Sequence, residues 1–381
     1  MWLVPALRFP EFTEEWEEHY LAEYLDFKNG LNPSANKFGS GIKFISVMDI
    51  LNNDFITYDC IRTSVEITPE EQVAFAVEKG DMLFQRSSET LEDVGRANVY
   101  MDDRPAVFGG FVIRGKKKAE YNPMFFRYLL ASPYARKKVI PMGAGAQHFN
   151  IGQDGLSKVK LHFPILQEQQ KIADLLRLIN ERISTQNKII EDLKLLKSAI
   201  SLNVLHSDTW EQFKIKDIAQ IGRGRVISSI EISQQKSPTY PVYSSQTSND
   251  GIMGYLDDYM FEGEYISWTT DGANAGTVFY RNGKFNCTNV CGLLKLIKGF
   301  DTHFVSLVLA EATKKYVSIN LANPKLMNNT MGNIQIRLPK LEEQKRISIV
   351  FRVLQRLWTI HNSLLTEYIK QKQYLLSQMF I

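Results

Sequence analysis

The sequence predicts an α+β protein in which two domains alternate with two long helices that pair antiparallel, so that the second half of the chain repeats the first. Three observations predict this organisation: a length of 381 residues, a ten-residue motif that occurs twice, and a long segment without proline or glycine after each copy. At about 150 residues per domain, the length leaves room for two or three domains. The composition is typical of a folded protein, because 44% of the residues are apolar and 23% are charged.

The repeated motif marks the start of each long helix. It reads PILQEQQKIA at residues 164–173 and PKLEEQKRIS at residues 339–348, so the copies are 175 positions apart and share Pro, Leu, Glu, Gln and Ile. Since neither copy is followed by a helix-breaking residue for several heptads, both are predicted to open long helices. The expected order along the chain is a domain at 1–165, a helix at 166–206, a domain at 207–339 and a helix at 340–381.

Apolar residues recur in both helices at alternating steps of four and three positions, which is the seam spacing of a coiled coil. Seven of nine seam positions in each helix are apolar or aromatic. The first helix leads to the second domain and the second helix starts there, so a packed pair must be antiparallel, with the two domains related by a pseudo-twofold axis. The central seam positions are Ile172, Leu176, Ile179, Ile183, Gln186 and Ile190 in the first helix and Ile347, Phe351, Leu354, Trp358, His361 and Leu365 in the second.

The middle seam position of each helix is polar. Gln186 and His361 occupy these positions, and an antiparallel pair would bring them together. We expect a polar contact that fixes the register of the two helices. The alternative is that each residue is merely tolerated at a hydrated point of the seam. Unchanged stability and register in a His361→Leu variant would exclude the contact.

Charge and cysteine content exclude several classes of protein. The 45 Lys and Arg against 42 Asp and Glu give a net charge of +3, too low for a uniformly basic DNA-coating protein, so any nucleic-acid surface must be local. Cys60, Cys287 and Cys291 are too few for a disulfide framework and lack partners at zinc-ligand spacing, so no metal site is expected. No apolar run reaches the ~20 residues of a membrane span, and a reducing cytoplasm is the expected location.

No catalytic motif in the chain is complete. The segment Asn122-Pro123-Met124-Phe125 lacks the second proline of an adenine methyltransferase loop and is interpreted as a helix start with proline in its first turn. Phosphate-binding loops, nucleophile elbows and zinc-protease motifs do not occur. Glu168 and Glu343 are expected to be structural, since a negative charge favours the first turn of a helix. We therefore expect no enzymatic activity from this chain.

Two related but different domains on a rod suit a bipartite linear target. Twenty-nine seam residues would span roughly 43 Å, and one turn of B-DNA measures about 34–36 Å. The two domains would then read different halves of an asymmetric, split site on double-stranded DNA. The alternative is a coiled-coil adaptor that binds proteins and has no DNA specificity. Sequence-selective retention on DNA would distinguish the two.

Several motifs together resemble the specificity subunit of type I restriction-modification systems. The strongest is the Phe-Pro or Leu-Pro turn before a Leu-x-Glu-Gln helix start, because it occurs twice. The resemblance covers the whole chain and the order of its four parts. The other segments that contribute to it are Leu7–Phe12 with Trp16-Glu17, Tyr240–Ser244, and Gly272–Gly276.

The resemblance implies a non-catalytic subunit with two target recognition domains, each a mixed α/β domain with a twisted, partly barrel-like sheet. Each domain would read one half-site, and the two-helix spacer would set the gap and dock two methyltransferase (modification) subunits. Motor-nuclease (restriction) subunits would complete a complex for host defence against foreign DNA. The chain itself is expected to bind no cofactor, with S-adenosylmethionine, ATP and Mg on the partner subunits.

Base edges are read by polar side chains on loops, and phosphates by cations and backbone amides. Each domain has three polar loops that fit, although ordinary surface turns have the same composition. The candidates in the first domain are Ser46, Gln85, Arg86, Ser87, Arg96, Asn98, Gln147, His148 and Asn150. Those in the second are Tyr243, Ser245, Gln246, Thr247, Asn249, Thr269, Thr270, Asn274, Lys325 and Asn328. Of two basic runs, Arg114 with Lys116–Lys118 is expected to be a solvated surface, whereas Arg136–Lys138 suits a helix end and a phosphate contact equally.

Overall fold

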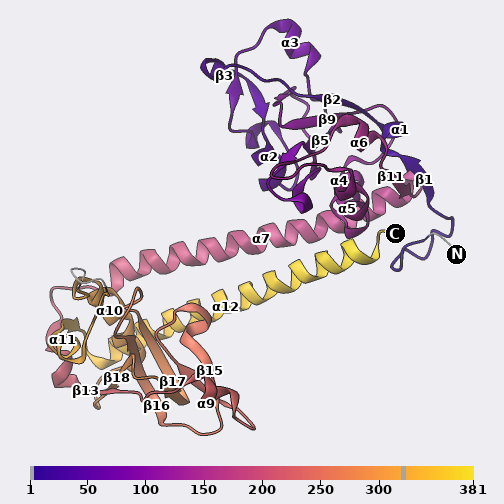
Figure 1. The fold of residues 1–381 in the computed structure, drawn as a ribbon. Helices are drawn as coiled ribbons and strands as arrows, with labels where there is room; N and C mark the ends of the chain where they lie inside the picture. The colour runs from indigo at the N-terminus through magenta and orange to yellow at the C-terminus, as the bar shows by residue number, and fades with distance from the viewer. Residues whose placement is uncertain (1–3, 319–322) are drawn as a thin grey trace. The chain divides into compact units, whose positions relative to one another are not determined.

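The computed structural model describes residues 4–318 and 323–381, and the chain divides into two units (Figure 1). The first unit comprises Met1–Lys188 with Asn362–Ile381, and the second comprises Ile189–His361. Each unit therefore contains one domain together with a part of both long helices. No described helix is long and apolar enough to cross a membrane.

The first domain contains short helices and strands in alternation. Its strands are β1 (Glu17–Tyr20), β2 (Leu25–Asn29), β3 (Phe38–Ile45), β4 (Ser64–Val65), β5 (Met82–Gln85), β6 (Ser87–Ser88), β7 (Ala97–Val99), β8 (Val107–Phe108), β9 (Val112–Lys117), β10 (Phe149–Asn150) and β11 (Lys160–Phe163). Its helices are α1 (Leu21–Tyr24), α2 (Val47–Asn52), α3 (Pro69–Ala74), α4 (Pro123–Ala131), α5 (Pro133–Val139) and α6 (Gln153–Ser157).

The second domain has fewer and longer strands. They are β12 (Glu211–Lys214), β13 (Ala219–Arg223), β14 (Tyr240–Tyr243), β15 (Ile252–Leu256), β16 (Phe261–Thr269), β17 (Val278–Cys287), β18 (Cys291–Leu296) and β19 (Gln335–Leu338). Its helices are α8 (Ile215–Ile218), α9 (Ser229–Ser233), α10 (Thr302–Ala312) and α11 (Asn328–Asn333). The long helices are α7 (Leu166–Val204) and α12 (Leu341–Gln378), so both begin at equivalent positions of the repeated motif.

The two domains share one sheet frame, which confirms the predicted mixed α/β repeat. In the first, antiparallel strands lie in the order β2-β9-β5-β7, and β3 pairs in parallel with β8. In the second, one sheet has the order β13-β18-β16-β17-β14-β15, and β14 pairs in parallel with β17. The antiparallel pairs β5–β9 and β16–β18 correspond in register. Met82 pairs with Gly115 in the first domain, as Ile266 pairs with Leu294 in the second.

Each domain is closed by a pair formed from its first and last strands. Strand β1 pairs with β11, and β12 pairs with β19, both antiparallel over four residues. The last strand then leads through a proline turn directly into α7 or α12. Closure of the domain therefore places its outgoing helix next to the chain segment that entered it.

The predicted seam is removed from solvent in both units. None of its twelve central positions is exposed, and those at the start of α7, such as Ile172 and Leu176, pack into the core of the first domain. In the first unit Arg182 lies 5.7 Å from the ring of Tyr368, and in the second Lys197 donates to Gln355 at 3.3 Å. Higher numbers on α7 thus meet lower numbers on α12, so the helices are antiparallel. Gln186 and His361 belong to different units, and their contact stays a prediction.

The glutamine of the repeated motif attaches each long helix to its domain. Oε1 of Gln169 accepts from the backbone N–H of Asn122 at 3.0 Å, and its Nε2 donates to the Pro164 carbonyl. Gln344 makes the same pair of bonds with Asp301 and Pro339, at 2.9 and 2.8 Å. Asn122 and Asp301 are themselves the N-caps of α4 and α10, as the Asn122-Pro123 signal predicted for α4. Both glutamines are buried, so these bonds are shielded from water.

The glutamate that precedes this glutamine in the repeated motif has different surroundings in the two copies. Glu168 is fully buried and receives two hydrogen bonds from Arg8, both at 2.7 Å. The side chain of Glu343 is exposed and has no hydrogen bond or ion pair within the described part of the chain. Both glutamates lie in first helical turns, as the sequence predicted. A structural contact is present only for Glu168, and its distant partner Arg8 was not foreseen.

Candidate nucleic-acid interface

In the first domain the turn Gly109–Phe111 links the candidate loops. The backbone N–H of Gly109 donates to Ile45 next to the Ser46 loop, and the N–H of Arg86 donates to Phe111. Nη1 of Arg86 also donates to the carbonyl of Gly110 at 3.3 Å. The β8–β9 turn therefore holds two predicted loops, which start at Ser46 and Gln85, at one edge of the sheet.

The third predicted loop joins this cluster through a short strand pair. Strand β10 pairs with β6, so that Asn150 faces Ser87, and the Ser87 hydroxyl donates to the Asn150 side chain. Gln147 and His148 lie exposed before that pair. Arg96 is exposed as well, although an ion pair at 2.6 Å engages it with Asp93. The structure thus brings all three predicted loops of the first domain into one cluster.

Two predicted residues of this domain are buried and are left out of the interface. Asn98 is fully buried and its amide donates to the carbonyls of Ile50 and Asn53, at 2.9 and 2.8 Å. Gln85 is also buried, and its amide donates to Ser87. These side chains brace the loops from inside, because strands β5 and β7 are covered on both faces. The polar sequence pattern alone gave no sign of that burial.

Phe111 is a candidate interface residue that the sequence interpretation did not include. Its ring is 68% exposed at the tip of the β8–β9 turn, and its carbonyl accepts a hydrogen bond from the backbone N–H of Arg86, whose guanidinium donates to the neighbouring Gly110. It lines an apolar cavity of about 390 Å³, together with Ser46, Phe44 and Met48. An exposed aromatic ring beside a cation is a stacking surface for bases. The Gly109-Gly110-Phe111 sequence, which exposes an aromatic residue on a glycine turn, was the available signal.

In the second domain the equivalent turn is Thr288–Val290. The N–H of Thr288 donates to Tyr243, and the N–H of Thr270 donates to Val290, as Arg86 does to Phe111 in the first domain. The flanking Cys287 and Cys291 are buried thiols, and burial raises the pKa of both. Across the described residues, no group of three or more His, Cys, Asp or Glu side chains is arranged to hold a metal ion.

The other two loops of the second domain meet each other. The N–H of Leu326 donates to Thr270, and the ammonium of Lys325 lies 3.9 Å from the carboxylate of Asp271. Asn328 accepts a hydrogen bond from Nε of Arg223 at 2.9 Å, and Arg223 was not among the predicted residues. It was missed because it lies inside strand β13 rather than on a loop.

The predicted residues of the second domain differ in exposure. Thr247, Asn249 and Asn274 are exposed, whereas Tyr243, Ser245 and Gln246 are half-buried. Thr269 and Thr270 are buried and, like Asn98, are left out of the interface. Strand β16, which ends at Thr269, is buried over its last five residues, and Thr270 follows it directly.

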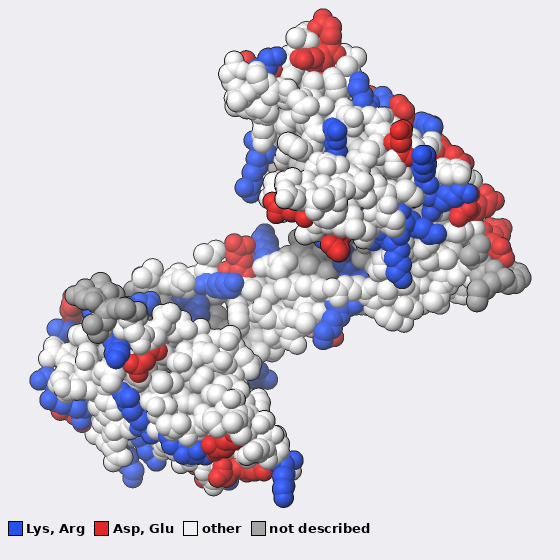
Figure 2. Space-filling model, viewed as in Figure 1, with Lys and Arg blue, Asp and Glu red and all other residues white. Residues whose placement is uncertain are grey.

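Basic side chains near the candidate loops are mostly engaged in structural contacts. Arg136 donates from Nη2 to the carbonyls of Glu92 and Val94, both at 2.7 Å, and burial lowers its pKa to about 10. Lys116 and Lys117 form ion pairs with Glu78 and Glu120, as expected of a solvated surface. Arg114 of the same run is buried over the ring of Phe108, so that expectation was wrong for it. Basic and acidic side chains are interspersed on the face of the first unit seen in Figure 2.

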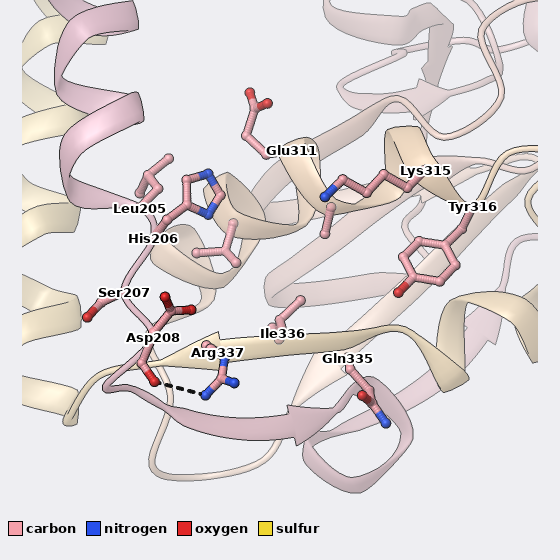
Figure 3. A pocket seen from close by; sticks show the side chains of 12 residues that line it. Leu205, His206, Ser207, Asp208, Glu311, Lys315, Tyr316, Gln335, Ile336 and Arg337 are labelled. Carbon is pink, nitrogen blue, oxygen red and sulfur yellow. Dashed lines mark hydrogen bonds between the residues drawn. The ribbon is translucent and has the colours of Figure 1, made fainter.

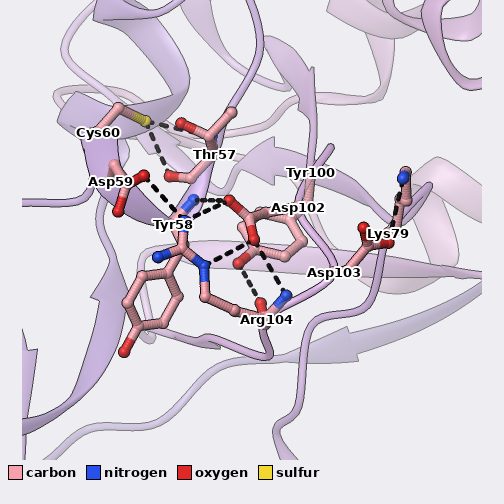
Figure 4. Close-up of polar contacts among 9 residues, drawn as sticks. All are labelled: Thr57, Tyr58, Asp59, Cys60, Lys79, Tyr100, Asp102, Asp103 and Arg104. Atoms are coloured by element: carbon pink, nitrogen blue, oxygen red, sulfur yellow. Dashed lines mark hydrogen bonds and ion pairs between the residues drawn. The ribbon is translucent and has the colours of Figure 1, made fainter.

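A further polar cluster of the first domain contains none of the predicted loop residues. Arg104 donates to Asp59 and Asp102 at 2.9–3.0 Å and lies 4.4 Å over the ring of Tyr58 (Figure 4). The guanidinium holds the pKa of the Asp102 carboxyl well below its usual range. Because two carboxylates neutralise it, Arg104 offers no free positive charge to a phosphate.

The second unit has a polar cavity of about 330 Å³ beside the end of α7 (Figure 3). Arg337 lines it and donates to the carbonyls of Asp208 and Trp210, both at 3.1 Å. His206 and Lys315 also line it, and none of the predicted loop residues does. The two hydrogen bonds of Arg337 fix the segment that connects α7 to β12.

Comparison with known proteins finds one domain family in two consecutive segments of the chain. The family model of the type I restriction modification DNA specificity domain matches twice, at residues 13–195 and 207–371. The chain belongs to the specificity-subunit family of type I restriction-modification systems. It is 36% identical over 205 residues to a Mycoplasma pneumoniae protein named as a type I specificity subunit, which covers 53% of this chain and 85% of that protein.

The chain is also similar to a second relative and, in its fold, to a solved structure. The chain is 42% identical over 149 residues to the specificity subunit of the Mycoplasma pneumoniae type I restriction enzyme MpnII, covering 39% of this chain and 44% of that subunit. The crystal structure of the S subunit from M. genitalium has the same fold, with a TM-score of 0.70 at 15% identity over 99% of both chains.

Proposed function

We propose that each domain of this specificity subunit reads one half of a split, asymmetric DNA site, and that α7 and α12 set the gap between the halves. The observation that favours this function most is the shared sheet frame with different loops on its edge. Equivalent turns, Gly109–Phe111 and Thr288–Val290, support loops of different sequence and length in the two domains. One frame with two sets of polar loops is what two different half-sites would require.

The catalytic steps are assigned to partner subunits. The chain would supply DNA recognition, the modification subunits would hold S-adenosylmethionine, and the restriction subunits would use ATP and Mg. Family membership supports this division, since the matched relatives are named as specificity subunits. The buried thiols and engaged carboxylates described above offer no competing catalytic group.

Methylome sequencing of cells tests the proposal directly. The chain would be expressed with its modification subunit, and a matched strain would lack only this chain. We expect a split, asymmetric N6-methyladenine motif that disappears with the chain. Methylation that persists unchanged would instead favour a protein-binding adaptor without DNA specificity.

A second experiment tests the helices as a ruler. One heptad inserted at equivalent points of both helices adds about 10 Å, or about three base pairs of DNA. The unspecific gap in the methylation motif should lengthen while both half-sites stay the same. An unchanged gap would contradict the ruler.

The second unit carries a surface suited to a modification subunit. Along α12 the side chains of Ile349, Val350, Val353, Leu357 and Ile360 are exposed, in addition to the buried seam residues. They recur at helical spacing and form a second apolar stripe, a surface that a partner helix covers well. A Val353→Asp variant should weaken binding of the modification subunit about tenfold or more. Arg356→Ala on the same helix is the control, and equal binding by both variants would exclude this stripe.

A further inference from the structure

The first loop of the second domain rests on a buried arginine. Arg281 on β17 is only 3% exposed, and its guanidinium lies 3.6 Å from the ring centre of Tyr243 and 4.3 Å from that of Phe279. Nε donates to the hydroxyl of Ser267 at 3.0 Å. No carboxylate of the described chain forms an ion pair with it. Arginine stacked between aromatic rings in this way is a rigid, planar support.

The loop Ser244–Gly251 is folded tightly onto this support. The N–H of Ser244 donates to the carbonyl of Gly251 at 2.9 Å and closes the loop. A Cβ atom built on Gly251 would lie 3.1 Å from Nη2 of Arg281, so the backbone comes close to the guanidinium. Burial lowers the pKa of Arg281, and the nearby charge of Asp250 opposes that shift. The loop therefore both covers the buried cation and partly neutralises it.

The tip of the loop has an uncommon backbone. Asn249, Asp250 and Gly251 have φ values of 48°, 57° and 81°, three left-handed residues in succession. Such residues normally occur singly, and each non-glycine one costs about 1 kcal/mol or more. The side chain of Asn249 is exposed and makes no hydrogen bond with any described residue. The strained turn thus presents an unpaired amide to solvent.

At the position equivalent to Arg281, the first domain has a buried tyrosine instead of an arginine. Strand register makes Tyr100 the counterpart of Arg281, because Val99 faces Met82 as Tyr280 faces Ile266. Tyr100 is buried in an apolar cluster with Ile45 and Ile50, and helix α2 covers it. A cationic support under a polar loop is thus a property of the second domain.

We infer that Asn249 reads an adenine in the half-site bound by the second domain, and that Arg281 is a positioning residue that holds the loop ready for it. This inference rests on the proposed function. An asparagine amide matches the N6 and N7 edge of adenine with two hydrogen bonds. A loop already held in its binding conformation loses less entropy when DNA arrives.

Methylome sequencing of the assembled complex tests the reader residue. In an Asn249→Ala variant, one A·T position of one half-site should lose its preference about tenfold or more, and the other half-site should stay unchanged. Asn282→Ala, an exposed asparagine on β17, is the matched control and should leave the motif intact. An unchanged motif in Asn249→Ala, or a change at a G·C position, would overturn the inference. If the wild-type complex gives no split motif, the proposed function itself fails.

Two variants, one of Arg281 and one of the loop that lies on it, test whether Arg281 holds the loop in place. Arg281→Lys keeps the charge but removes the planar stacking, and Gly251→Ala pushes the loop away from the guanidinium. Both should relax the same A·T position that Asn249→Ala relaxes, whereas the control variant Asn282→Ala should leave that position unchanged. Purification of each variant with its modification subunits shows that the chain is folded. If Gly251→Ala and Arg281→Lys assemble and leave the motif unchanged, Arg281 has no positioning role.

Discussion

The two copies of the repeated motif place identical residues in different surroundings. Gln169 and Gln344 make the same two hydrogen bonds, from the helix start to the cap of a domain helix and to the preceding proline. Glu168 is buried against Arg8, whereas the equivalent Glu343 is exposed. Sequence identity within a repeat therefore preserves a contact only where both partners belong to the repeated frame. Arg8 lies outside it, in the segment before β1.

The glutamates should give the largest difference between the copies. Replacing Glu168 by Ala removes one partner of a buried, doubly hydrogen-bonded ion pair, which costs about 3 kcal/mol or more of unfolding free energy. Glu343→Ala changes an exposed side chain and should cost less than about 0.5 kcal/mol. Scanning calorimetry of the chain measures both. Equal effects would mean that Arg8 contributes nothing to the first unit.

The glutamines should show no such difference. Gln169→Leu and Gln344→Leu each leave a buried backbone N–H and a carbonyl without their partner, at a cost of about 1–3 kcal/mol. We expect similar losses in denaturant unfolding, because the bond lengths in the two copies agree within 0.2 Å. Gln167→Leu, at an exposed neighbouring position, is the control. A large loss in one copy alone would show that the two attachments are not equivalent.

The comparison extends to the residue after the parallel strand of each domain. In the first domain both the backbone N–H and the hydroxyl of Ser46 donate to the Asp49 carboxylate at 2.7 Å at the start of α2. Ser46→Ala should cost about 1 kcal/mol. Ser244 has no helix to cap, and Ser244→Ala should cost only a few tenths. Urea titration would resolve the difference, and a smaller loss for Ser46→Ala would contradict the capping role.

Low pH should destabilise the second unit because His303 is partly buried in its uncharged form. Nδ1 of His303 lies 2.9 Å from the hydroxyl of Ser348, and burial, with the nearby Arg352, lowers its pKa to about 4. Its ordinary pKa is about 6.5, so the unfolded chain binds the proton more readily. The second unit should lose stability as pH falls from about 6.5 to about 4. His303→Gln should flatten that slope, and an unchanged slope would assign it to other groups.

The sequence predicted the frame better than the interface. Periodicity and the repeated motif gave both long helices, because their signal is local and extends over many residues. The burial of Asn98, Thr269 and Thr270 was not predictable in this way, since the sequence does not show whether a polar residue braces a loop or faces solvent. Arg281 was missed because its support for the loop depends on strand pairing rather than on sequence proximity.

The attachment through Gln169 and Gln344 also has a consequence for rotational phase. Because each glutamine fixes its domain to the first turn of a long helix, the azimuth of that domain follows the azimuth of the helix. One residue added to a helix turns everything beyond it by about 100°, whereas seven residues leave an offset of only about 20°. Gap lengths that keep both domains turned toward the same side of the DNA should therefore form a discrete series in heptad steps.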